Sequence, residues 1–157
     1  MSTIAERLIK DLGTAMRDKD AERRDVLRYL RSEVKNAEIE KGRSLTDDEV
    51  TQVIQRQIKQ RRESIEQFEK GGRQDLVDTE QAQIAILEEY LPPQLSDEEL
   101  ERIAGDIAAQ QGLSGTSDIG KLMGPLREQV GAQAEGRAIS NAARKVLEKR
   151  ANGEATG

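Results

Sequence analysis

The 157-residue sequence contains no cysteine and no histidine, and only Tyr29, Phe68 and Tyr90 are aromatic. Without cysteine, disulfide bonds and thiolate metal sites are excluded, and a reducing compartment fits the composition. Without histidine, the chain lacks the commonest metal ligand and the usual general base, which removes every Ser-His and Cys-His catalytic arrangement. We therefore expect no metal ion and no cofactor.

Long apolar runs are also missing. No run approaches the roughly 18 residues that suggest a membrane span, and the first residues mix charged with apolar side chains, unlike a signal peptide. We therefore expect a cytoplasmic protein with no membrane partner.

The net charge of −5 argues against attraction to nucleic acid over the whole surface. Between Asp118 and Arg150, however, seven Lys and Arg oppose four Asp and Glu, a local balance of +3.

The composition and the spacing of apolar residues predict an all-α fold. Apolar residues recur at steps of three and four, and strand-length alternation is absent. Short connections indicate an N-terminal antiparallel helical bundle over residues 1–91. Pro92 and Pro93 prevent helix continuation, so residues 92–96 are predicted to be a proline hinge. A small C-terminal three-helix domain is expected over residues 97–150, and residues 151–157 have nothing to bury and are expected to be a disordered tail.

Three capping boxes mark predicted helix starts, at Thr3/Glu6, Thr46/Glu49 and Ser96/Glu99. Gly42 is expected to stop the second helix just after Lys41. The inward side of the first helix is predicted to consist of Ile4, Leu8, Leu12 and Ala15 with Met16.

One stretch, from Asp118 to Arg137, combines helical periodicity with glycine. Its apolar positions are Ile119, Leu122, Met123, Leu126 and Val130. Gly120 and Gly124 lie inside this predicted helix, where each glycine costs about 1 kcal/mol relative to alanine. Close approach of another backbone is the usual reason, and the partner is either a neighbouring helix or a ligand. Pro125 removes one helical N–H and clashes with a preceding carbonyl, which predicts a kink or a break.

The segment from Gly115 to Lys121 matches seven positions of a phosphate-binding P-loop. The eighth is Leu122, where Ser or Thr should contact magnesium, and no hydrophobic strand precedes the segment. A nucleotide site is therefore disfavoured. Ser117 or Asp118 is expected to cap the following helix instead.

A second basic feature lies on the second predicted helix. Arg24, Arg28, Arg31 and Lys35 follow one another at steps of four, three and four, so they share one side. One interpretation is a solvated face supported by neighbouring carboxylates. The other is a stripe that contacts phosphates, since the planar guanidinium grips phosphate oxygens well.

The glycine-containing stretch resembles the tail of the GatB/YqeY family, which has a Gly-Lys-x-Met-Gly core, a short linker ending in Asp-Gly and a closing helix. Here the core is Gly120-Lys121-Leu122-Met123-Gly124, and the linker ends in Glu135-Gly136. The segments Tyr90–Ser96 and Arg73–Val77 also resemble the YqeY-like members, so the similarity covers roughly residues 1–150. Gly131 and Gln133 stand where the family often has lysine, which weakens any grip that depends on those lysines.

The resemblance implies a tRNA-binding role. In the amidotransferase that completes glutaminyl- or asparaginyl-tRNA, the equivalent tail of the B subunit helps to hold the tRNA. The resemblance thus implies an accessory protein that has tRNA as its partner and is connected with aminoacyl-tRNA amidotransfer. Such a protein would act beside an amidotransferase or an aminoacyl-tRNA synthetase. The residues implied are Gly120, Lys121, Met123, Gly124, Gly136, Arg137 and Lys145. The alternative for this cluster is tight helix packing with Lys121 merely exposed.

Two other functions stay open. Family naming implies a carbon–nitrogen ligase that uses glutamine as amido-N-donor, but no ATP site, ammonia source or catalytic residue is visible in the sequence. The third interpretation is a helical protein–protein adaptor without RNA, in which the basic stripe of the second helix binds an acidic partner.

Overall fold

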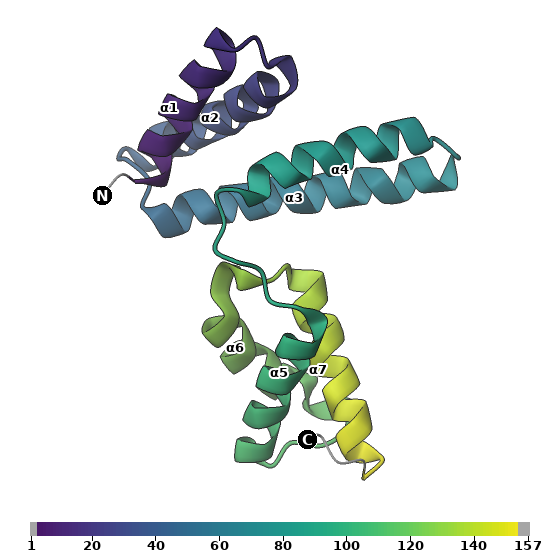
Figure 1. The fold of residues 1–157 in the computed structure, drawn as a ribbon. Helices are drawn as coiled ribbons and strands as arrows, with labels where there is room; N and C mark the ends of the chain where they lie inside the picture. Colours follow the sequence, from purple (N-terminus) through teal and green to yellow (C-terminus); the bar gives the residue numbers. More distant parts are fainter. Residues whose placement is uncertain (1–2, 154–157) are drawn as a thin grey trace. The chain divides into compact units, whose positions relative to one another are not determined.

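The computed structural model describes residues 3–153, and these form helices and turns without a strand (Figure 1). This confirms the all-α prediction. The α-helices are α1 (Ile4–Arg17), α2 (Ala21–Lys41), α3 (Asp47–Lys70), α4 (Gln74–Glu88), α5 (Asp97–Gln111), α6 (Ile119–Val130) and α7 (Gly136–Ala151). Two short 3₁₀ helices, η1 (Thr116–Asp118) and η2 (Gly131–Gln133), flank α6.

The chain divides into two compact units, Met1–Pro92 and Pro93–Gly157. In the first unit, α1 packs on α2, α3 packs on α4, and α2 contacts both α3 and α4 (Figure 1). The core of this unit is mostly aliphatic, with fully buried leucines such as Leu27 and Leu87 contributed by different helices and the ring of Tyr90 at its edge. Burial of these apolar faces supplies most of the stability of such short helices.

The helix boundaries follow local chemistry. Both hydrogen bonds of the capping box are present at Thr46/Glu49 and at Ser96/Glu99. In the first, the N-cap hydroxyl accepts from the glutamate N–H, and in the second the glutamate carboxylate accepts from the N-cap N–H. At Thr3 the described contacts include only the first half, in which Glu6 N donates to the Thr3 hydroxyl at 3.0 Å. α2 ends at Gly42, whose φ of 71° lies in the left-handed region that glycine tolerates.

The inward face of α1 differs from the prediction at one position. Leu8, Leu12 and Ala15 are buried, but Met16 is 53 % exposed, so its assignment to the core is wrong. Periodicity places Ala15 and Met16 equally well, because both lie within one step of the stripe. The small side chain of Ala15 is the one that faces the neighbouring helix.

The C-terminal unit consists of α5, α6 and α7, which pack pairwise around a second aliphatic core. Of the predicted kink or break at Pro125, the break is wrong, because α6 runs continuously from Ile119 to Val130, and the kink stays a prediction. Leu122, Leu126 and Val130 are buried on either side of the proline, and they hold both halves of the helix against the core. The preceding Lys121 faces solvent, where water can satisfy a carbonyl that the proline leaves without a donor.

The last described residues extend the C-terminal helix. Ala151 is the final residue of α7, and Asn152 and Gly153 form a turn. The predicted disordered tail is therefore wrong for Ala151, while residues 154–157 of that prediction lie outside the described residues. No helix in the described part of the chain is long and apolar enough to cross a membrane.

Candidate nucleic-acid interface

The glycines of α6 lie on the side opposite its core face. Leu122, Leu126 and Val130 point into the core, whereas Gly120 and Gly124 are exposed. A Cβ atom added at either glycine would find no atom within 4 Å apart from its two chain neighbours and the local helix backbone. No neighbouring helix in the described chain therefore explains the two glycines, and one turn of the α6 backbone is open to approach from outside.

Two cations accompany this open turn. Lys121 follows Gly120 directly, and its side chain is 73 % exposed. Its ammonium lies 3.7 Å from a carboxylate oxygen of Asp118, a loose contact at helical spacing. Arg127 lies one turn beyond Gly124 and is also exposed, although sequence reasoning left it out of the site. Spacing could have found it, because positions 120, 124 and 127 share one side of a helix.

Met123 lies apart from the open face. It is half-buried and packs against the core of the C-terminal unit.

The cap of α6 differs from the prediction, since Asp118 precedes the helix but makes no side-chain capping bond. Its carboxylate instead accepts from the Ser114 N–H at 3.0 Å. The capping prediction for Ser117 or Asp118 is therefore wrong, because the preceding loop competes for the carboxylate.

The start of α7 follows the C-terminal end of α6, which lies about 15 Å along the helix from Gly120. Gly136 and Arg137 are exposed in its first turn, which contains no acidic residue and whose N-cap, Glu135, makes no side-chain capping bond. An added Cβ at Gly136 would meet nothing within 4 Å. The partial positive charge of a helix start and the Arg137 guanidinium together favour an anion here.

The linker between α6 and α7 is held by residues that sequence reasoning missed. The Leu95 N–H donates to the Gln133 carbonyl at 2.8 Å, and the Gln94 side-chain amide donates to the Ala132 carbonyl at 2.9 Å. Both donors lie inside the predicted proline hinge. No local pattern signals these contacts, because they join segments 38 residues apart.

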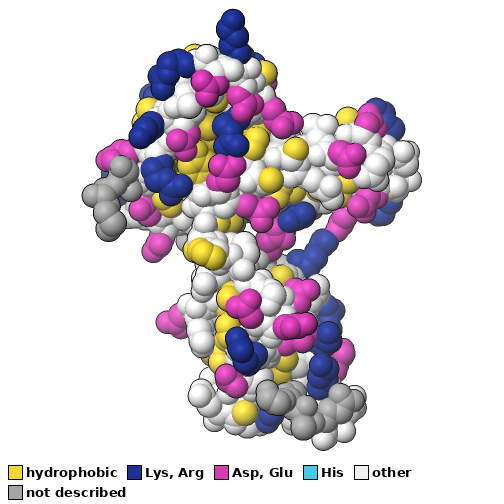
Figure 2. Space-filling model, in the orientation of Figure 1, with side chains coloured by type: hydrophobic (Ala, Val, Ile, Leu, Met, Phe, Trp, Pro, Cys, Tyr) yellow, Lys and Arg dark blue, Asp and Glu magenta, His cyan; other side chains and the backbone are white. Residues whose placement is uncertain are grey.

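Lys145 lies at a different edge of the C-terminal unit. Its ammonium forms a 2.9 Å ion pair with Glu101 of α5, and this hydrogen bond raises the pKa of Lys145. Figure 2 shows Lys and Arg side chains along the α7 edge of this unit, with Asp and Glu side chains among them. The structure thus brings Gly120, Lys121 and Gly124 together, places Gly136 and Arg137 at the start of α7, and turns Lys145 towards α5.

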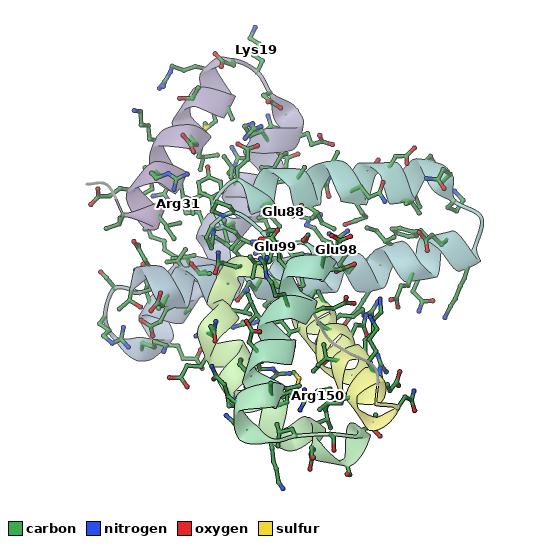
Figure 3. The ribbon with its side chains drawn as sticks, turned by 60° about the horizontal axis from the view of Figure 1, so that its bottom comes forward. Lys19, Arg31, Glu88, Glu98, Glu99 and Arg150 are labelled. Carbon is green, nitrogen blue, oxygen red and sulfur yellow. The ribbon has the colours of Figure 1, made fainter. Side chains whose placement is uncertain are left out.

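The basic stripe of α2 is partly neutralised. Arg24 forms an ion pair with Asp25 at 2.9 Å, and Arg28 is exposed. Arg31 and Lys35 line a small groove between α1 and α2, together with the apolar Ala5, Leu8 and Ile9. Figure 3 labels Arg31 on α2. The four cations therefore differ in their surroundings although they share one side of the helix.

Acidic side chains do not assemble into a metal site in the part of the chain that the structure describes, where no group of three or more could hold an ion. The carboxylates Asp97, Glu98 and Glu99 occupy the first turn of α5, where they complement the helix dipole (Figure 3).

Comparison with known proteins decides the family. The family model described as "Yqey-like protein" matches residues 5–147. The chain belongs to this family. The YqeY-like chain is 32% identical over 143 residues to "Altered inheritance of mitochondria protein 41, mitochondrial" of Pyrenophora tritici-repentis, which covers 89% of this chain and 76% of that protein.

Two proteins of the same name match the YqeY-like chain over a shorter length. The protein of Lachancea thermotolerans is 41% identical over 85 residues, which covers 54% of this chain and 46% of that protein. The protein of Eremothecium gossypii is 36% identical over 96 residues, which covers 59% of this chain and 52% of that protein. The chain thus spans about half the length of these two relatives.

Proposed function

We propose that this YqeY-like chain binds tRNA through its C-terminal unit, with the open turn of α6 and the start of α7 facing the RNA. The observation that carries the proposal is the pair of exposed helical glycines, Gly120 and Gly124, at which an added Cβ would meet no other element of the described chain. Helical glycine weakens a helix by about 1 kcal/mol relative to alanine. No packing contact in the described chain offsets this cost, so an external partner that approaches the backbone closely is the best explanation.

The charges on α6 and at the start of α7 favour a polyanion as that partner. Lys121 and Arg127 flank the glycines on α6, and Arg137 stands at the positive end of the α7 dipole. Phosphate oxygens accept hydrogen bonds from such side chains and from the N–H groups at a helix start. The surrounding residues from Asp118 to Arg150 also carry a local balance of +3 in a chain of net charge −5.

The recognition mode is contact with phosphates and with RNA shape. All three aromatic residues, Tyr29, Phe68 and Tyr90, precede Pro93, so the C-terminal unit has no aromatic side chain on which a base could stack. Structured RNA is commonly recognised through its backbone and 2′-hydroxyl groups. The resemblance to the amidotransferase tail supports tRNA as the RNA class and aminoacyl-tRNA amidotransfer as the process.

A filter-binding titration of the full chain with tRNA at about 50 mM and about 200 mM salt tests the proposal. We expect measurable binding at low salt and a steep loss at the higher salt, because phosphate contacts release counterions. Lys121→Glu and Arg137→Glu should each weaken binding at least about tenfold at low salt. Arg102→Glu on the exposed side of α5 is the matched control, with the same charge change and little expected effect.

Two results would refute the proposal: no binding at either salt concentration, or equal losses for the control and the two site variants. Amidation of mischarged tRNA by the pure chain, dependent on glutamine and ATP, would instead support the carbon–nitrogen ligase that the family naming implies.

A second candidate function is a protein–protein adaptor, and the groove between α1 and α2 favours it. Ile9 is 51% exposed in this groove, and Arg31, Lys35 and one carboxylate, Glu38, line it as well. An amphipathic acidic helix fits such a surface, with apolar contacts at Ile9 and ion pairs at its basic edge. A pull-down that survives nuclease treatment and is lost with Ile9→Glu would favour this function, and a nuclease-sensitive one would count against it.

A further inference from the structure

Gln57 of α3 is buried in the N-terminal unit, with 1% of its surface exposed. Its amide nitrogen donates to the carboxylate of Glu33 on α2. Because a carboxylate at neutral pH only accepts hydrogen bonds, this contact fixes the orientation of the amide. The other end of the amide, Oε1, is buried and has no hydrogen-bond partner among the described residues. A buried acceptor without a donor is destabilising, so its presence requires an explanation.

Gln57 lines a cavity of about 200 Å³ where α2, α3 and α4 meet. The other lining residues are Tyr29 of α2, Gln60, Arg61 and Ser64 of α3, and Glu80 of α4. Pockets for drug-sized ligands have volumes of about 300 to 1,000 Å³. This cavity therefore suits a ligand of only a few non-hydrogen atoms.

Three acceptors around the cavity keep unused lone pairs, and the lining also holds donors of Arg61 and Gln60. The Ser64 hydroxyl donates to the backbone carbonyl one turn earlier at 3.2 Å. Arg61 donates to Oε2 of Glu80 at 3.2 Å, which leaves the second carboxylate oxygen. Together with Gln57 Oε1 and the lone pairs of Ser64, the lining thus offers three acceptors. A ligand that fits this set must donate hydrogen bonds.

The charges favour a cationic donor. The guanidinium of Arg61 is paired with Glu80, while Glu33 adds a negative charge behind Gln57. Tyr29 also lines the cavity, and aromatic rings attract ammonium groups. We propose that this cavity binds a small primary ammonium ion, whose three N–H groups donate to Gln57, Ser64 and Glu80. The proposal is independent of RNA binding by the C-terminal unit.

Titration of the full chain with n-butylammonium chloride, followed by two-dimensional amide NMR, tests this site. We expect saturable shifts for amides near Gln57 and Ser64 in the millimolar range. The matched probe is n-butyltrimethylammonium chloride, which keeps the charge and the alkyl chain but has no N–H donor. It should bind at least about tenfold more weakly, the factor expected for loss of charged hydrogen bonds.

The variants use the same readout. Gln57→Leu removes the acceptor and should weaken n-butylammonium binding about tenfold, while Gln52→Leu, at an exposed position of α3, should leave it unchanged. If Gln57→Leu fails to fold, Ser64→Ala provides a second test, and it should likewise weaken n-butylammonium binding. The proposal is overturned by unsaturable shifts, by equal affinity for the two probes, or by undiminished binding in the folded Gln57 or Ser64 variant.

Discussion

The hydroxyl of Tyr90 donates a hydrogen bond to the carboxylate of Asp11, and so joins the end of the N-terminal unit to its first helix. The Arg7 guanidinium lies 5.2 Å from the centroid of the Tyr90 ring. The neighbouring Glu89 accepts two hydrogen bonds from Arg23 of α2, at 3.0 and 2.9 Å. The residues just before the two prolines are therefore fastened to both α1 and α2.

Tyr90→Phe should lower the free energy of unfolding by about 1 kcal/mol, because it deletes the hydrogen bond to Asp11 and keeps the buried ring. Burial raises the pKa of Tyr90, and the hydrogen bond to Asp11 raises it further. A raised pKa contributes stability that is complete below the ordinary tyrosine pKa of about 10 and is lost as the pH rises above it. Urea unfolding from pH 8 to 11 measures both effects.

In that experiment the wild-type protein should lose stability above about pH 10 more steeply than Tyr90→Phe. Tyr29→Phe is the control, since it removes the same hydroxyl from a side chain that is 51% exposed. An identical alkaline profile for wild type and Tyr90→Phe would contradict the role given to the Asp11 contact.

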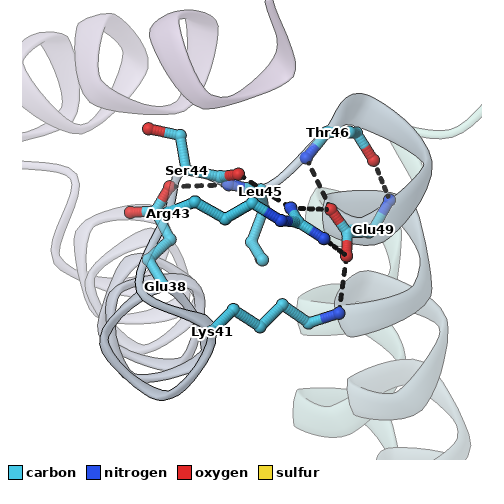
Figure 4. A network of polar contacts seen from close by, with 7 residues as sticks. All are labelled: Glu38, Lys41, Arg43, Ser44, Leu45, Thr46 and Glu49. Atoms are coloured by element: carbon cyan, nitrogen blue, oxygen red, sulfur yellow. Dashed lines mark hydrogen bonds and ion pairs between the residues drawn. The ribbon is translucent and has the colours of Figure 1, made fainter.

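Glu49 organises the connection between α2 and α3 (Figure 4). Its carboxylate accepts from Arg43 at 2.8 Å, from Lys41 at 2.6 Å and from the Thr46 N–H at 3.0 Å. The hydrogen bond from Arg43, followed by that from Lys41, lowers the pKa of Glu49 well below its ordinary value. A lowered pKa means that ionised Glu49 stabilises the folded protein. This stabilisation is complete above the ordinary glutamate pKa of about 4.3 and is lost as the pH falls below it.

Glu49→Gln should therefore lower the thermal midpoint at pH 7 and flatten the loss of stability on acidification. Thermal unfolding followed by circular dichroism between pH 3 and 7 measures this. Glu40→Gln, at an exposed position of α2, should keep the wild-type profile. A steep acid loss that persists in Glu49→Gln would show that other carboxylates dominate.

Gly120→Ala and Gly124→Ala should separate stability from binding. Gly120→Ala should raise the free energy of unfolding by up to about 1 kcal/mol, because alanine favours the helix and its methyl group meets no other helix. Gly124→Ala should gain less, because a Cβ atom before Pro125 crowds the proline ring. The same methyl groups should weaken tRNA binding, since they block close approach to the α6 backbone. Chemical unfolding and filter binding on the same preparations test both directions.

Gly13→Ala is the matched control for these two variants, because Gly13 also lies inside a helix and an added Cβ would meet only the end of the Arg17 side chain, at 3.5 Å. It should gain stability without loss of tRNA binding. Unchanged binding in the double variant of Gly120 and Gly124 would remove the main support for the RNA interface.

Glu101→Gln should strengthen tRNA binding about two- to fivefold at low salt, because it releases Lys145 from its ion pair and removes a competing negative charge. Its unfolding transition should hardly move, since exposed ion pairs contribute little to stability. Asp106→Asn, at an exposed position of the same helix, makes an equal charge change. An equal gain from this control would mean that Lys145 has no specific part in binding.

Local chemistry made the helices predictable. The capping boxes at Thr46 and Ser96 and the stop at Gly42 depend on contacts within a few residues, which the sequence displays directly. Apolar periodicity likewise identified the face of α6 that is buried. It could not separate Ala15 from Met16, because a single helix does not reveal where its neighbour lies.

The sequence by itself determined the all-α class, most helix boundaries and the presence of two unusual glycines in α6. Only the tertiary structure decided that, among the described residues, no helix covers these glycines, that Lys145 pairs with Glu101, and that the buried Gln57 has an oxygen without a hydrogen-bond donor. The physical reason is the distance along the chain over which each effect acts. Capping and periodicity act within one or two turns of a helix, whereas exposure and pairing depend on which distant helix packs alongside.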